Sequence, residues 1–97
     1  MLIYFKFKNL CNLFLEFILT NEMLVLSILN EAGFTIISDQ INRLLQNQIL
    51  NSSNLQEYFT LPNKKMDISI LEQIINVLET KMETKSQKVI LLILLFL

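Results

Sequence analysis

The residues that could carry out chemistry in this chain are few and widely spaced. Histidine, the commonest general base and metal ligand, is absent from all 97 residues. Cys11 is the single cysteine, so it has no second thiol for a disulfide and no partner with which to bind zinc or form a nucleophilic pair. We interpret Cys11 as a small apolar residue that fills space, which fits a reducing compartment.

The carboxylates and serines form no recognisable catalytic motif. Ser52 and Ser53 lack the glycines of a nucleophile elbow, and a chain with one glycine has no phosphate-binding glycine loop. The acidic residues are scattered over expected helix caps and surface positions: Asp39, Asp67, Glu72 and Glu79. The sequence therefore predicts that the protein is not an enzyme, and it indicates no catalytic, cofactor-binding or metal-binding residue.

The charges disfavour direct binding of nucleic acid. Eight Lys and Arg against nine Asp and Glu give a formal charge of −1, whereas binding to nucleic acid requires that several phosphates be neutralised together. Lys64 and Lys65 form one basic pair. The later lysines alternate with glutamates at helical spacing, as on a solvated helix face: Lys81, Lys85 and Lys88 with Glu79 and Glu83.

The composition predicts a helical fold. Hydrophobic residues make up 53% of the chain, enough for a small core, and one Gly with one Pro are too few for the many turns of an all-β fold. We expect an all-α fold, a small bundle of four to six helices with one short extended segment.

The first half of the bundle is predicted from apolar spacing and from Gly33. Residues 9–32 form one or two helices with a break near Thr20 and Asn21, and Gly33 ends the last of them. Apolar Phe34 and Ile36 alternate with polar Thr35, which predicts a short extended segment over residues 34–37. Ser38 or Asp39 then caps a helix that runs to about Leu50.

The second half contains the clearest helix. Ser53 and Gln56 resemble a capping box for a short helix over residues 54–59, which Pro62 prevents from continuing. Asp67 caps the next helix, and a final helix passes through Val89. The apolar stripe of the helix after Asp67 is Ile68, Leu71, Ile74, Ile75, Leu78 and Met82.

Both ends of the chain are apolar. We divide the chain into an N-terminal extension without an assigned role, residues 1–20, and a helical domain, residues 21–97. Lys6 and Lys8 lie within the first apolar stretch, whereas a signal peptide has its basic residues before an uninterrupted apolar stretch. As a helix, residues 89–97 would span roughly 14 Å, about half of the thickness of a bilayer core. These features disfavour membrane anchoring. The alternative hypothesis is nevertheless a small membrane-associated helical protein that is anchored through its two apolar ends.

Two segments resemble the N-terminal domain of the DNA polymerase epsilon B subunit, the second-largest and accessory subunit. Residues 28–45 (ILNEAGFTIISDQINRLL) are similar to its opening helix, glycine, apolar segment and second helix, and residues 70–81 (ILEQIINVLETK) to its next long helix. Residues 86–94 correspond to its final helix, so the resemblance covers about residues 23–94.

The resemblance implies a fold similar to the lid domain of AAA+ ATPases and a tethering role in DNA replication in the nucleus. The implied partners are proteins, namely the polymerase catalytic subunit or the replicative helicase assembly. The phosphoesterase-like region that follows this domain in the family is absent here, so the chain is expected to be a fragment, an incomplete gene product or a stand-alone copy. Apolar residues left after core packing are the candidate partner surface: Phe34, Tyr58 and Phe59.

Overall fold

The prediction of an all-α fold with four to six helices is confirmed. The structure, a computed structural model, describes residues 2–63 and 65–82. This part contains five helices: α1 (Leu2–Thr20), α2 (Glu22–Glu31), α3 (Thr35–Gln46), α4 (Ser52–Tyr58) and α5 (Ile68–Lys81). The predicted final helix through Val89, the stretch of residues 89–97, and Lys64, Glu83, Lys85 and Lys88 lie outside the described residues.

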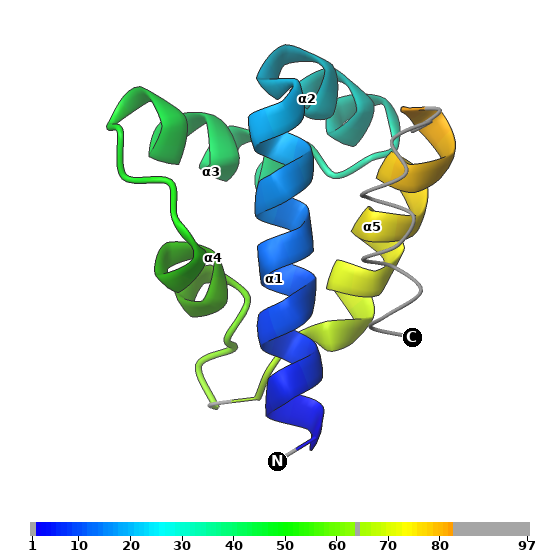
Figure 1. Cartoon of the computed structure of the whole chain (residues 1–97). Coiled ribbons are helices and arrows are strands. Elements are labelled where there is room, and N and C mark those ends of the chain that lie inside the picture. The colour runs from blue at the N-terminus through cyan, green and yellow to red at the C-terminus, as the bar shows by residue number, and fades with distance from the viewer. Residues whose placement is uncertain (1, 64, 83–97) are drawn as a thin grey trace.

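From Phe7 onward, the N-terminal stretch belongs to the core of the bundle. α1 runs through the middle of the molecule, and α2, α4 and α5 pack against it (Figure 1). It starts at Leu2 rather than at the predicted Asn9, and the helical spacing of its buried side chains extends back to Phe7. The stretch that we separated as an extension thus supplies six buried side chains: Phe7, Cys11, Leu13, Phe14, Phe17 and Ile18.

The chain turns sharply between α1 and α2, at the predicted break. The Asn21 side chain accepts a hydrogen bond of 3.2 Å from the backbone N–H of Leu24, which satisfies one free amide at the start of α2. Glu22 adds a negative charge at the positive end of that helix. The two helices meet at an angle of 114°.

Gly33 ends α2, as predicted. Its φ is +92°, a left-handed conformation that costs glycine little. The N–H of Gly33 donates to the carbonyl of Asn30 at 3.2 Å, and the N–H of Phe34 donates to the carbonyl of Leu29 at 2.8 Å. This pair of bonds is a Schellman motif, which satisfies the last carbonyls of the helix.

The extended segment predicted over residues 34–37 is wrong, because α3 begins at Thr35. Phe34 occupies the cap position without a side-chain hydrogen bond. The predicted caps lie inside the helix: Ser38 is buried and its hydroxyl donates to the carbonyl of Leu26 at 3.2 Å, while Asp39 is exposed. Phe34 and Ile36 do not share a buried strand face: Ile36 is 79% exposed, whereas Phe34 and Ile37 are partly buried against the core.

α3 also ends earlier than the predicted Leu50. Gln48 takes a left-handed conformation with φ of +57°. Its N–H donates to the carbonyl of Leu45, and the N–H of Ile49 donates to the carbonyl of Leu44, both at 3.0 Å. This second Schellman motif stops the helix without a glycine, so no glycine signalled its end.

The short helix α4 is capped by Asn51. Asn51 accepts from the backbone N–H of Asn54 at 2.8 Å, so the capping box predicted at Ser53 is wrong by two residues. The Gln56 amide instead donates to the Ser52 hydroxyl at 2.9 Å, and Ser52 donates to the Asn12 side chain of α1. This polar chain holds α4 against the central helix.

α5 confirms the predicted stripe. Leu71, Ile74, Ile75 and Leu78 are buried, and Asp67 caps the helix through the N–H of Ile70 at 3.4 Å. Before α5, a loop is closed by two backbone bonds, from Leu61 to Lys65 (2.7 Å) and from Asp67 to Phe59 (2.8 Å). On the outside, Lys6 of α1 forms an ion pair of 3.2 Å with Glu72; both side chains are about half exposed, so the pair contributes little to stability.

Candidate binding groove

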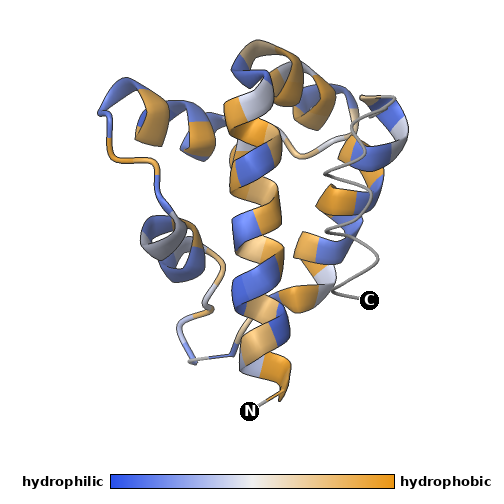
Figure 2. Ribbon diagram, in the orientation of Figure 1, coloured by the Kyte–Doolittle hydropathy of each residue, from blue (hydrophilic) through white to orange (hydrophobic). Residues whose placement is uncertain are grey.

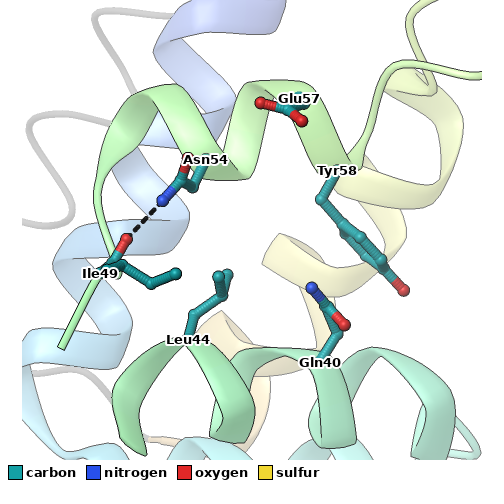
Figure 3. Close-up of a pocket in the computed structure, with 6 residues that line it drawn as sticks. All are labelled: Gln40, Leu44, Ile49, Asn54, Glu57 and Tyr58. Carbon is teal, nitrogen blue, oxygen red and sulfur yellow. Dashed lines mark hydrogen bonds between the residues drawn. The ribbon is translucent and has the colours of Figure 1, made fainter. Parts of the chain in front are cut away.

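A groove separates α3 from α4. α3 packs on α2 and α4 packs on α1, but α3 and α4 do not pack on each other (Figure 1). The space between them has a volume of about 440 Å³ and opens to solvent. Its lining residues, which we call the α3–α4 groove, are Gln40, Leu44, Ile49, Asn54, Glu57 and Tyr58 (Figure 3).

The floor of the α3–α4 groove is apolar. Leu44 points from α3 toward α4, and Ile49 extends beside it from the connection between the two helices (Figure 3). Leu44 is 7% exposed, because its other side contacts the core, whereas Ile49 is 47% exposed. A ligand that covers Ile49 would therefore remove apolar surface from water, which favours binding.

The connection that carries Ile49 is held in place by hydrogen bonds. The Asn54 side-chain amide donates to the carbonyl of Ile49 at 2.6 Å, while the Asn54 backbone N–H bonds to the Asn51 cap. Together with the left-handed Gln48, these contacts fix where the chain leaves α3 and enters α4. The floor of the groove is thus preorganised, which lowers the entropy cost of binding.

The rim of the groove is polar. Gln40 supplies an amide from α3, and Glu57 and Tyr58 supply a carboxylate and a phenol from α4. The Tyr58 ring packs edge-on against Phe59, with centroids 5.0 Å apart. Burial raises the pKa of Tyr58, so the phenol is protonated at neutral pH and can donate or accept a hydrogen bond.

Of the three aromatic residues predicted as a partner surface, Tyr58 lines the groove. Phe59 is 3% exposed and packs edge-on against Phe14 of α1, with centroids 6.0 Å apart, so it belongs to the core. Phe34 is partly buried against the core beside the Gly33 turn. The structure therefore brings together one of these three side chains with five residues that were not predicted as part of a partner surface.

Those five residues gave weak signals in the sequence. Ile49 falls within the helix predicted to run to about Leu50, whereas the turn at Gln48 places it on the connection between α3 and α4. Gln40, Asn54 and Glu57 have the composition of ordinary helix surface. Two helices that both pack elsewhere and leave a gap between them are a tertiary feature, which local spacing does not encode.

Among the described residues, the lining of the groove offers aliphatic, amide, carboxylate and phenol groups. Cys11 is buried away from it in α1, and burial raises the pKa of that thiol to about 12, so it stays protonated. Across residues 2–63 and 65–82, no three Cys, Asp or Glu side chains lie close enough to hold a metal ion.

No single described helix is long and apolar enough to cross a membrane. α1 and α2 together meet the criteria of length and composition, as a pair bent by 114°. Comparison of the chain with protein-family models, with curated proteins and with solved structures finds no match.

Proposed function

We propose that this chain is a non-catalytic protein-interaction module whose α3–α4 groove binds a segment of a partner protein. The observation that carries the proposal is the groove itself, an apolar floor of Leu44 and Ile49 inside a polar rim. Protein-binding surfaces commonly combine an apolar centre with polar groups at the edge.

The lining suggests which partner segment fits. A short amphipathic helix laid between α3 and α4 would place one apolar side chain over Ile49 and polar groups against the rim. Among the described residues of the lining, Glu57 alone is charged, so the segment should carry Lys or Arg near its apolar anchor. Tyr58 offers an aromatic contact of the kind enriched at binding hot spots.

Within this proposal, the partner class comes from the resemblance to the N-terminal domain of the DNA polymerase epsilon B subunit. The proposed role is to tether a replicative polymerase in the nucleus, with the polymerase catalytic subunit or the helicase assembly as partner and a fold of the AAA+ lid type. Its support is that residues 28–45 and 70–81, which carry the resemblance, lie on α2, α3 and α5 of an all-α fold.

A pull-down from nuclear extract tests the proposal. The full chain is the bait, Ile49→Asp places a charge in the groove, and Ile36→Asp is the matched control, since Ile36 is 79% exposed on α3 and does not line the groove. We expect wild type and Ile36→Asp to recover replisome subunits, and Ile49→Asp to lose them. Circular dichroism checks that all three are folded. Recovery of no replisome component by the folded wild type, or equal recovery by Ile49→Asp, contradicts the proposal.

A further inference from the structure

The first turn of α1 exposes apolar side chains on every side. Leu2, Ile3, Tyr4 and Phe5 are 85%, 62%, 53% and 61% exposed, and burial of α1 in the core begins at Phe7. Successive residues of a helix point about 100° apart, so four in a row surround its axis. Figure 2 shows this turn as a hydrophobic end of the central helix.

Positive charges follow directly after the apolar turn. Lys6 and Lys8 are exposed, and the first acidic residue along the chain is Glu16. Lys6 pairs with Glu72 of α5 through a half-exposed contact, which is weak enough to exchange for another anion. Lys65 and the 40% exposed Leu61 belong to the α4–α5 connection, which lies at the same end of the molecule in Figure 1.

We propose that this end of the molecule binds the surface of an anionic lipid bilayer. A protein partner would cover one face of the helix and leave the opposite apolar side chains in water, whereas a lipid interface surrounds the whole turn. Four residues extend about 6 Å along a helix, a length comparable with the depth of roughly 5–10 Å to which helices lying in the interface bury their apolar face. Tyr4 and Phe5 then lie at headgroup level, and Lys6 and Lys8 reach lipid phosphates.

This lipid-binding end is separate from the α3–α4 groove, and neither proposal depends on the other. One short apolar turn with a few cations provides weak, reversible binding that salt reduces. It would hold the chain at a surface while leaving the groove free for a protein.

Vesicle co-sedimentation of the full chain tests this inference. The vesicles contain phosphatidylcholine alone or with phosphatidylserine. The double variant Ile3→Ser with Phe5→Ser removes apolar groups from the turn, and Met23→Ser with Ile36→Ser is the matched control, since both residues are 79% exposed elsewhere. We expect binding that requires phosphatidylserine, a loss of about tenfold or more in partitioning for the first double variant, and no change for the control. Lys8→Gln should weaken partitioning about fivefold.

Three results would overturn the inference. The first is that folded wild type binds neither kind of vesicle. The second is that the Ile3→Ser and Phe5→Ser variant binds as well as wild type, which would place lipid binding in another part of the chain. The third is that wild type is an oligomer without lipid and the double variant is a monomer, which would make the turn an interface between copies.

Discussion

Two residues with left-handed backbone end α2 and α3, and only one of them is a glycine. Gly33 and Gln48 each provide the φ > 0 position of a Schellman motif, at +92° and +57°. Glycine adopts this region freely, whereas a residue with a Cβ loses about 1–2 kcal/mol there. Gln48 is therefore a position of local strain in an otherwise regular fold.

Opposite substitutions at these positions should have opposite effects. A Cβ at Gly33 would meet no atom within 4 Å, so Gly33→Ala should destabilise the fold by about 1 kcal/mol through backbone conformation alone. Gln48→Gly should stabilise it by up to about 1 kcal/mol. Urea denaturation of both variants provides the measurement, and destabilisation by Gln48→Gly would argue against the left-handed turn.

Cys11 should be unreactive in the folded chain. Burial raises the pKa of its thiol from 9.0 to about 12. Between these values the unfolded chain loses a proton that the folded chain keeps, so the stability that the neutral thiol contributes is complete below pH 9 and is lost as pH rises toward 12. At pH 8 we expect an aromatic disulfide reagent to modify the native thiol roughly 100-fold more slowly than the urea-unfolded thiol. Equal rates would place Cys11 at the surface.

At the scale of the elements, the cap of α4 positions one wall of the groove. Asn51→Ala removes the 2.8 Å bond to Asn54 and should cost about 1 kcal/mol of folding free energy. Ser53→Ala is the control, because Ser53 is exposed and makes no cap, and it should change stability by less than about 0.5 kcal/mol. The reverse order of effects in thermal denaturation would mean that Ser53 caps the helix after all.

Elements with strong local signals could be predicted from the sequence. Gly33, the Asn21 break and the Asp67 cap were found because caps and glycine turns depend on the residues beside them. The start of α3 was missed because Phe34 caps it without a side-chain bond, and the hydroxyl of Ser38 instead reaches Leu26 of α2. The groove was missed, apart from Tyr58, because it depends on how α3 and α4 pack against other helices.

For the whole molecule, α1 is the element on which the bundle depends. Phe14→Ala removes a fully buried ring that contacts Phe59 and should destabilise the fold by about 3–5 kcal/mol, a large part of the stability typical of a small domain. Phe5→Ala on the same helix should cost less than about 0.5 kcal/mol, since Phe5 is 61% exposed. Equal effects in urea denaturation would contradict the central place of α1.

The central claim, that the α3–α4 groove receives a partner segment, is tested most directly by photo-crosslinking. A benzophenone side chain at position 49 lies on the groove floor, and the same group at position 36 lies on α3 outside the groove. In nuclear extract we predict that position 49 crosslinks a replisome subunit, within a segment that has an apolar residue next to Lys or Arg, and that position 36 does not. Adducts of equal yield and identity at both positions, or none at position 49, would contradict the claim.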